Sequence, residues 1–231
     1  MRIVIVGTGR MGLAVAAMAE ARGHAVGLVG SAENPGGTGL TKARLGDADV
    51  AVEFTRPDAA VANVIALVDA GLPVVCGTTG WEAELPKVEA LVDRQGGALL
   101  HGANFSVGVH LFLRAARQLA ERMAGRREFD AFILEEHHRA KRDAPSGTAR
   151  VLRERLRETD AAREYPITSV RAGATPGTHV LAYDGPDERI ALTHVARSRR
   201  GFAAGALAAA EWLPGRKGVH TFEDMLFGGP G

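Results

Sequence analysis

The sequence predicts an α/β protein in two parts, a parallel sheet flanked by helices followed by a smaller α+β region with a mixed sheet. Two observations lead to this prediction. Over the first hundred residues, short apolar runs alternate with helical patterns, which is typical of parallel strands joined by right-handed crossovers. Later, three β-like runs follow one another without helices between them, which indicates an antiparallel or mixed sheet. The 231 residues allow one large domain or two small ones.

The first part contains five predicted strands separated by helical patterns or turns. The strands are residues 2–6, 24–30, 50–54, 73–76 and 98–101. The helices expected here are residues 11–22, 57–70 and 83–95. Short apolar strands with helices between them predict a sheet that is buried on both faces.

The second part is predicted to mix helices and closely spaced strands. Its helices are expected at residues 109–123, 148–158 and 202–213, and its strands at residues 131–136, 167–171, 179–183 and 189–195. Such a sheet has one face on its own helices, and the other face needs cover, which a second subunit would provide. The tail, residues 218–226, is expected to pack back on the first part.

Composition and charge exclude several classes of protein. The formal net charge is +1, which gives no general attraction for nucleic acid or anionic lipid. The single cysteine, Cys76, cannot form an intramolecular disulfide and is expected to pack in the core. No run of about 18 apolar residues predicts a membrane span. The first residues enter a strand pattern directly, without a signal-peptide pattern, so we expect a cytoplasmic protein.

A glycine-rich turn follows the first strand. Residues 7–12 read Gly7-Thr8-Gly9-Arg10-Met11-Gly12. In this pattern Gly7 permits the tight turn, Gly9 lets the backbone approach a pyrophosphate, and Gly12 lets helix and strand pack closely. The helix that follows offers free N–H groups to phosphates. We therefore predict a dinucleotide-binding domain over residues 1–104, completed by the C-terminal segment 205–231.

The preference between the two nicotinamide dinucleotides stays open at this stage. An acidic residue at the end of the second strand typically holds the adenine ribose of NAD. This chain has Gly30 and Ser31 there, with Glu33 two positions later. The missing carboxylate favours NADPH, yet no arginine follows directly, so Arg10 or Lys42 would have to bind the 2′-phosphate.

The most informative run is residues 135–149, which contains His137, His138 and Lys141. Adjacent strand residues point to opposite faces, so joint binding of one metal ion by the two histidines is not favoured, and we expect no metal. No Gly-x-Ser-x-Gly elbow surrounds Ser146, which argues against a nucleophilic serine. Acid–base catalysis by His137 and Lys141 fits better, because histidine titrates near neutrality and a lysine can donate a proton.

Ser146 is predicted to cap the helix that starts at Gly147 and Thr148. Capping alone explains a serine here. The free N–H groups of this helix start would also suit a carboxylate, with Lys141 adding positive charge. Asp143 either orients Lys141 or stabilises the turn.

Residues 135–149 closely resemble the signature of the dihydrodipicolinate reductase (4-hydroxy-tetrahydrodipicolinate reductase) family. Further blocks resemble that family in the same order along the chain. These blocks are residues 7–12, 54–57, 77–80, 103–108 and 218–226. The resemblance therefore covers nearly the whole chain, although the region between the second strand and Val50 is short for the family.

The resemblance implies a Rossmann-like domain, a substrate-binding and oligomerisation domain over residues 105–204, and a homotetramer. It implies NADPH or NADH as cofactor and a small cyclic dicarboxylate as substrate. The implied activity is reduction of 4-hydroxy-tetrahydrodipicolinate to tetrahydrodipicolinate in the diaminopimelate route to lysine.

The same resemblance implies roles for individual residues. His137 would be the catalytic proton donor or acceptor, and Lys141 a second proton donor. Substrate would be bound by His138, Ser146, Gly147, Thr148 and Arg199, with Arg200 as the alternative to Arg199. The cofactor contacts would be Gly7, Thr8, Gly9, Arg10, Met11, Gly12, Gly77, Thr78, Thr79, Gly102, Ala103, Asn104 and Phe105.

Two other functions remain as alternatives. Another two-domain dehydrogenase, acting on an amino acid or sugar, would share the glycine turn but would not need the run from His137 to Thr148. A nucleotide sensor or DNA-binding regulator would rest only on two basic clusters, Arg126-Arg127 and Arg197-Arg199-Arg200. With a balanced total charge, these clusters are more typical of substrate binding or of a solvated rim.

Overall fold

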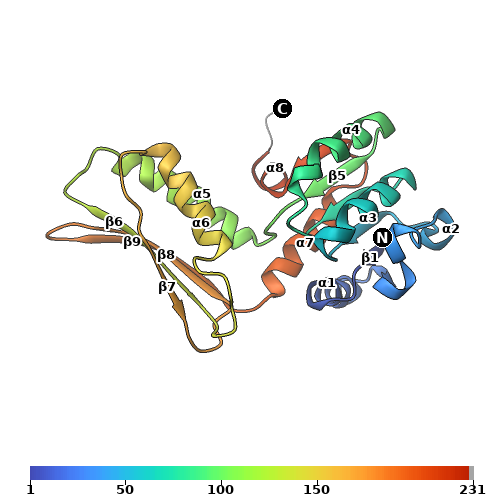
Figure 1. Ribbon diagram of the computed structural model, residues 1–231, viewed down its shortest axis with the longest axis horizontal. Coiled ribbons are helices and arrows are strands. Elements are labelled where there is room, and N and C mark those ends of the chain that lie inside the picture. The colour runs from blue at the N-terminus through green and yellow to red at the C-terminus, as the bar shows by residue number, and fades with distance from the viewer. Residues whose placement is uncertain (229–231) are drawn as a thin grey trace. The chain divides into compact units, whose positions relative to one another are not determined.

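The computed structural model describes residues 1–228 and shows two compact units (Figure 1). The first unit comprises Met1–Ser106 together with the chain from Arg200 onward, and the second is Val107–Arg199. Residues 229–231, the end of the predicted segment 205–231, lie outside the described part. Among the described residues, no helix has the length and apolar character needed to cross a lipid bilayer.

The first unit is built on a six-stranded parallel sheet in the order β10-β5-β4-β3-β1-β2. Its strands are β1 (Arg2–Val6), β2 (Ala25–Val29), β3 (Val50–Glu53), β4 (Val74–Cys76), β5 (Ala98–His101) and β10 (Gly218–Thr221). Its α-helices are α1 (Arg10–Ala21), α2 (Lys42–Leu45), α3 (Pro57–Asp69), α4 (Leu85–Gln95), α7 (Arg200–Trp212) and α8 (Phe222–Phe227). Single 3-10 turns occur at Ser31–Glu33, Pro35–Gly37 and Glu82–Glu84.

Strand β1 shows why this sheet is buried on both faces. Ile3 and Ile5 enter a core that includes residues of α1 and α7, whereas Val4 and Val6 enter a second core with residues of α3 and α4. Alternate strand residues point to opposite faces, so a strand covered on both sides must be apolar at every position. The continuous apolar run that predicted a parallel sheet thus reflects two separate cores.

The C-terminal tail adds a strand that the sequence did not reveal. The sequence predicts that this tail packs back on the first part, but it predicts no strand there. Strand β10 pairs in parallel with β5, with Gly218 opposite Ala98. The side chain of Thr221 then caps α8 by accepting a hydrogen bond from the Asp224 N–H. Four residues followed at once by a helix are too short for a clear strand pattern.

The second unit is built on a four-stranded mixed sheet in the order β7-β6-β8-β9. Its strands are β6 (Asp130–His137), β7 (Ile167–Arg171), β8 (Gly177–Asp184) and β9 (Arg189–Ala196), and its helices are α5 (Val107–Met123) and α6 (Gly147–Thr159). Strand β6 runs parallel to β7 and antiparallel to β8, and β8 runs antiparallel to β9. The predicted combination of a parallel sheet and a mixed sheet is confirmed.

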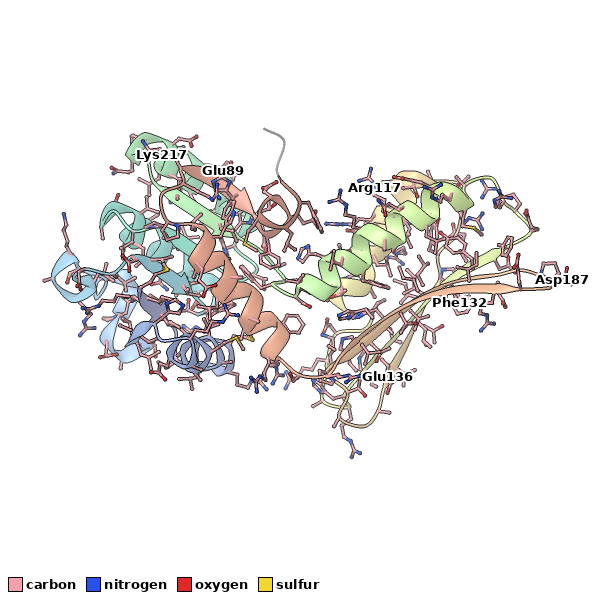
Figure 2. All side chains as sticks on the ribbon, turned by 180° about the vertical axis from the view of Figure 1, so that it is seen from behind. Glu89, Arg117, Phe132, Glu136, Asp187 and Lys217 are labelled. Atoms are coloured by element: carbon pink, nitrogen blue, oxygen red, sulfur yellow. The ribbon has the colours of Figure 1, made fainter. Side chains whose placement is uncertain are left out.

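The two faces of the mixed sheet differ. On one face, Ile133, Leu181 and Tyr183 pack with α5 and α6 in a buried core. The opposite face, which includes Phe132 and Glu136 on β6 (Figure 2), is not covered by the helices of this unit. Apolar side chains on that face remain exposed: Leu134 at 37%, Val170 at 37% and Val195 at 53%.

Candidate active site

Strand β6 brings two functional side chains onto the buried face of the mixed sheet. Burial alternates along the strand, and its buried positions are Ala131, Ile133, Glu135 and His137. Because a strand has a side-chain period of two, Glu135 and His137 point to the same face and His138 begins the chain beyond it. Glu135 is 0% exposed and His137 is 7% exposed. The strand ends between His137 and His138, and the expectation that the two side chains point to opposite faces stays a prediction.

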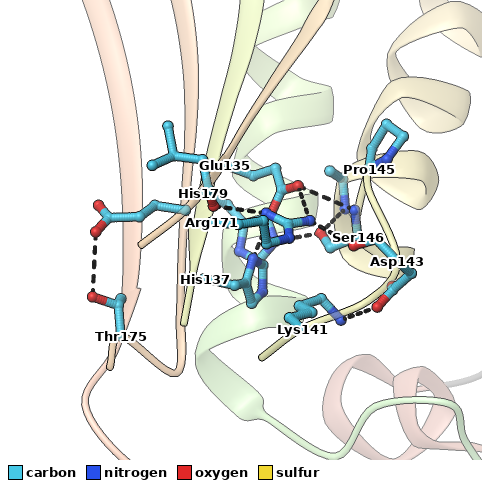
Figure 3. Close-up of polar contacts among 12 residues, drawn as sticks. Glu135, His137, Lys141, Asp143, Pro145, Ser146, Arg171, Thr175 and His179 are labelled. Carbon is cyan, nitrogen blue, oxygen red and sulfur yellow. Dashed lines mark hydrogen bonds and ion pairs between the residues drawn. The ribbon is translucent and has the colours of Figure 1, made fainter. Parts of the chain in front are cut away.

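The Glu135 carboxylate is the centre of a buried network (Figure 3). One oxygen, Oε2, accepts a hydrogen bond from Nδ1 of His137. The other oxygen, Oε1, accepts from Nη2 of Arg171 at 2.6 Å and from the backbone N–H of Ser146 at 3.3 Å. Burial by itself would raise the pKa of Glu135, but hydrogen bonds from Arg171, Ser169 and His137 outweigh burial and lower this pKa to about 2. Glu135 is therefore ionised near neutral pH.

The Glu135 carboxylate favours a His137 imidazole with its proton on Nδ1. An ionised carboxylate can only accept hydrogen bonds, so the ring nitrogen that faces it must donate. Burial lowers the pKa of His137; Glu135 opposes this effect, and the positive charges of Lys141 and Arg171 add to it. The other nitrogen, Nε2, forms no hydrogen bond with the described residues. A Cβ at Gly177 of the neighbouring strand would lie 2.9 Å from Nε2, so glycine leaves room for the ring.

Ser146 links the start of helix α6 to a second buried histidine. Its Oγ accepts from the Ala149 N–H at 3.2 Å, which confirms the predicted cap, and lies 3.1 Å from Nε2 of His179. Since Oγ accepts from the helix, its hydroxyl proton is available to donate to His179, whose own proton is then on Nδ1. Burial, followed by the nearby His137, lowers the pKa of His179 to about 4. His179 is thus neutral, and its buried Nδ1 has no hydrogen-bond partner among the described residues.

Lys141 lies in the turn between β6 and α6. Its Nζ is 2.7 Å from Oδ1 of Asp143, and both side chains are partly exposed. The hydrogen bond from Lys141 lowers the pKa of Asp143. Nη2 of Arg171 also donates to the backbone carbonyl of Asp143 at 2.6 Å, and this ties the turn to the Glu135 network. Asp143 therefore both pairs with Lys141 and helps to anchor the turn, so the two roles left open by the sequence coexist.

The remaining predicted substrate residues differ in placement. Gly147 and Thr148 open helix α6, where backbone N–H groups lack an intrahelical acceptor, and a Cβ at Gly147 would meet nothing within 4 Å. His138 is half-buried, and its backbone N–H donates to the Thr175 carbonyl at 2.8 Å. Arg199 is exposed at the end of the second unit and makes no hydrogen bond or ion pair with the His137 group among the described residues.

Three side chains that could each offer one ligand atom to a metal ion lie close together in this network. They are Glu135, His137 and His179. Each is already used: Glu135 pairs with the Arg171 guanidinium, His137 donates to Glu135, and His179 accepts from Ser146. A cation placed among them would be repelled by Arg171. We assign these groups to a hydrogen-bond network and not to a metal centre.

The first unit gathers the predicted cofactor residues at the carboxyl edge of the parallel sheet. The glycine turn follows β1, residues 77–79 follow β4, and residues 102–105 follow β5. Carboxyl ends of parallel strands share one edge, which is where ligands bind in open α/β sheets. Gly77 passes so close to the Phe54 ring that a Cβ would lie 2.0 Å from it, and Thr78 Oγ1 accepts from the Thr55 N–H at 2.8 Å.

The glycine turn has the geometry that its spacing predicts. Gly7 has a φ of +108°, and a Cβ there would lie 2.1 Å from the Phe54 carbonyl oxygen. A Cβ on Gly12 would lie 1.9 Å from the Gly7 carbonyl oxygen, whereas a Cβ on Gly9 would meet nothing within 4 Å. Gly9 precedes α1 without a side-chain cap, so the N–H groups of Arg10 and Met11 are available to an anion.

The end of β2 holds a carboxylate that the sequence reading considered missing. The 3-10 turn Ser31–Glu33 brings the Glu33 side chain back, and its Oε2 accepts from the Gly30 N–H at 2.9 Å. A Cβ on Gly30 would be 3.6 Å from both this oxygen and Thr8 Oγ1, so the carboxylate lies beside the glycine turn. In an extended chain Glu33 would lie too far from Gly30 to hold the ribose. The 3-10 turn reverses the chain direction, and this reversal cannot be seen from the sequence spacing.

Sequence reasoning missed three members of the mixed-sheet network: Glu135, Arg171 and His179. Glu135 was detectable, because it lies two positions before His137 on the same strand. Arg171, on the adjacent strand β7, lies opposite His137 in the sheet register. His179, on β8, lies opposite Glu135. Only the register of the sheet brings these last two residues to the site.

Comparisons with known proteins follow this two-unit division. The family model described as "Dihydrodipicolinate reductase, N-terminus" matches residues 1–105, and "Dihydrodipicolinate reductase, C-terminus" matches residues 108–226. A 4-hydroxy-tetrahydrodipicolinate reductase from Christiangramia forsetii is 34% identical over 98% of both chains. One from Natronomonas pharaonis is 38% identical over 98% of this chain and 100% of its own.

Solved structures agree on the fold. A dipicolinate-bound dihydrodipicolinate reductase from Paenisporosarcina sp. TG-14 superposes with a TM-score of 0.75 at 20% identity, covering 98% of this chain and 99% of its own. A probable dehydrogenase from Thermotoga maritima superposes with a TM-score of 0.58 at 12% identity, covering 97% of this chain and 92% of its own. The fold alone is thus shared with other dehydrogenases, and the sequence matches distinguish between them.

Proposed function

We propose that this chain, which belongs to the dihydrodipicolinate reductase family, reduces 4-hydroxy-tetrahydrodipicolinate to tetrahydrodipicolinate with a reduced nicotinamide dinucleotide. This reaction is a step of the diaminopimelate route to lysine. Matches to both halves of the family and to full-length relatives support the proposal. The observation that carries the site assignment is the group formed by Glu135, His137 and Lys141 next to the start of α6.

The second unit is proposed to bind the substrate, a small cyclic dicarboxylate. Gly147 and Thr148 would donate backbone N–H groups to one carboxylate, where the helix dipole favours negative charge. Lys141 would break its ion pair with Asp143 and would then interact with a substrate carboxylate or with the departing hydroxyl group. His138, Ser146 and Arg199 are proposed as further substrate contacts, with Ser146 acting mainly through the helix start that it caps.

Proton transfer is proposed for His137 and Lys141. The bound dinucleotide supplies the hydride, and the hydroxyl group leaves as water after it gains a proton. Lys141, which is partly exposed, would donate that proton. Nε2 of His137, which has no hydrogen-bond partner among the described residues, would exchange a proton with the ring as its unsaturation relocates.

The first unit is proposed to bind the cofactor along the carboxyl edge of its sheet. The turn from Gly7 to Gly12 and the start of α1 would hold the pyrophosphate. Residues 77–79 and 102–105 would line the nicotinamide and its ribose. These assignments include Thr8, Arg10 and Met11, whose backbone belongs to the same turn.

Of the two possible cofactors, NADH and NADPH, we propose that NADH is preferred. The Glu33 carboxylate lies at the end of β2, beside Thr8, where an acidic residue accepts hydrogen bonds from the adenine ribose. A 2′-phosphate at this position would be repelled by that carboxylate. The Arg44 guanidinium donates to the Glu33 carbonyl at 2.9 Å and would have to turn to the phosphate for NADPH to bind well.

A homotetramer in the cytoplasm is the proposed state. The uncovered face of the mixed sheet exposes Leu134, Val170 and Val195, and contact with other subunits would bury them. The regulator alternative receives no support from the basic cluster at Arg126-Arg127, because Arg127 pairs with Asp160 at 3.2 Å within the unit.

The decisive test couples the purified protein to the synthase that makes its substrate and follows loss of nicotinamide absorbance. NADH and NADPH are assayed separately. Substrate-dependent oxidation of the dinucleotide is expected. Oxidation that does not depend on the synthase product, or none with either cofactor, would contradict the proposed activity.

A further inference from the structure

We propose that Glu135 is a positioning residue for His137, whose carboxylate keeps the imidazole proton on Nδ1 and so presents Nε2 to the substrate. The inference deepens the proposed function and rests on it. Glu135 does not itself need to touch substrate.

The strand geometry makes this interaction direct. Glu135 and His137 are two residues apart on β6, share its buried face, and join through Oε2 and Nδ1. A carboxylate has no proton to donate, so it accepts only the tautomer with a proton on Nδ1. In that tautomer Nε2 carries the lone pair. In the other tautomer Nε2 would carry the proton, and Nδ1 and the carboxylate would face each other as two acceptors.

The carboxylate is itself held in place from two other elements. Arg171 at the end of β7 donates to Oε1, and the Ser146 N–H before α6 donates to the same oxygen. Arg171 is anchored in turn by the backbone carbonyls of Val170 at 2.8 Å and Asp143 at 2.6 Å. The orientation of the His137 ring is therefore tied to the turn that carries Lys141, and both proton-transfer groups share one support.

No other neighbour can replace Glu135. The charged and titratable groups that face His137 are Glu135 on its own strand, Arg171 on β7, His179 on β8 and Lys141 in the turn. Arg171 and Lys141 are cations and only donate. The Nε2 of His179 is taken by Ser146. Glu135 is thus the one acceptor and the one negative charge in this group.

Glu135→Gln is the informative substitution, because its amide keeps the size of the side chain but can present either an acceptor or a donor to Nδ1. We expect the His137 ring to populate both tautomers. Proton transfer should then slow, with kcat lower by about 10- to 100-fold and KM for the substrate little changed. Loss of the negative charge should also shift the acid limb of the kcat profile to lower pH, because the remaining neighbours disfavour the imidazolium.

The matched control is Glu136→Gln on the same strand. Its side chain points to the opposite face, where its Oε1 accepts a hydrogen bond from Thr175 Oγ1 at 3.4 Å. This variant removes the same charge one residue away and should keep wild-type kcat and the wild-type ring tautomer.

The tautomer is read directly from 15N NMR of the histidine ring nitrogens, with the His137 signals assigned by their loss in His137→Gln. This measurement needs no substrate, so it stands even if the proposed reaction fails. A wild-type ring protonated on Nε2, or a Glu135→Gln ring still protonated wholly on Nδ1 with unchanged kcat, would overturn the proposal.

A double variant tests the same idea if Glu135→Gln misfolds, because that substitution leaves the partly buried Arg171 without its carboxylate partner. Glu135→Gln with Arg171→Gln removes both charges. The same mixture of tautomers is expected, and a ring protonated only on Nδ1 in this folded variant would equally overturn the proposal.

Discussion

The two units build their proposed binding sites from different chemical groups, backbone in one unit and side chains in the other. The edge of the parallel sheet uses backbone: glycines that admit close approach, and uncapped N–H groups at the start of α1. The mixed sheet uses side chains, with Glu135, Arg171 and His137 joined in a buried network. A backbone site depends on local spacing, whereas a side-chain site depends on which strands become neighbours. This difference suggests that substitutions in the two units will fail in different ways.

The largest expected effect is the loss of a proton-transfer group in the second unit. His137→Gln should lower kcat by about 100- to 10,000-fold, the range for loss of general acid–base catalysis, while the cofactor Kd stays unchanged. The proposed cofactor residues belong to the other unit, so we expect the affinity for the cofactor not to depend on this ring. Steady-state kinetics and fluorescence titration of NADH measure the two quantities. His24→Gln, a surface histidine that pairs with Glu211, is the control. Equal losses of kcat and cofactor affinity would contradict the division of roles.

Acid should destabilise the mixed-sheet network in two pH windows. His179 has a pKa of about 4 in the folded chain, below the ordinary value of 6.5, so the unfolded chain binds this proton first. The free energy of unfolding should therefore fall as the pH drops from about 6.5 to 4, by at most about 3 kcal/mol from this group. Glu135, with a folded pKa of about 2, adds a further loss between its ordinary 4.5 and 2.

Urea unfolding at pH 7 and pH 5 checks the first window. In His179→Gln the difference between the two pH values should shrink, and His101, His137 and His194, whose pKa values burial also lowers, contribute to the part that remains. An unchanged pH dependence in this variant would show that the second unit does not keep His179 neutral.

Two glycines in the first unit should separate folding from binding. Gly12→Ala places a Cβ 1.9 Å from the Gly7 carbonyl oxygen, so overpacking should destabilise the fold by about 1–3 kcal/mol. Gly9→Ala meets nothing within 4 Å and should leave the melting temperature near that of the wild type. It should still raise the cofactor Kd by about tenfold, because its methyl group would occupy space needed by the pyrophosphate. Normal binding of NADH by Gly9→Ala would contradict the proposal that the backbone of this turn holds the pyrophosphate.

The smallest effect concerns cofactor choice. Glu33→Gln keeps an acceptor for the Gly30 N–H but removes the charge beside Thr8. The ratio of kcat/KM for NADPH to that for NADH should rise by about tenfold. Glu84→Gln, an exposed residue paired with Lys87, is the control and should leave the ratio unchanged. A falling ratio would mean that Glu33 does not act on the ribose.

Prediction from sequence succeeded where the signal was local. The glycine turn, the buried parallel strands and the Ser146 cap each depend on a few consecutive residues, and the structure confirms their geometry. Strand β10 was not predicted, because its four residues are too few for a recognisable strand pattern. The position of the Glu33 carboxylate was not predicted, because a single 3-10 turn brings this side chain back to Gly30.

By itself, the sequence determined the fold class, the family and the presence of a strand that leads into the histidine run. Those features follow from periodicity and short motifs, which neighbouring residues encode. Only the tertiary structure decided that Arg171 and His179 would complete the network, because they reach it through the parallel pairing of β6 with β7 and the antiparallel pairing of β6 with β8. A buried carboxylate needs partners from distant segments to offset its desolvation, and register across a sheet is a property of the folded chain.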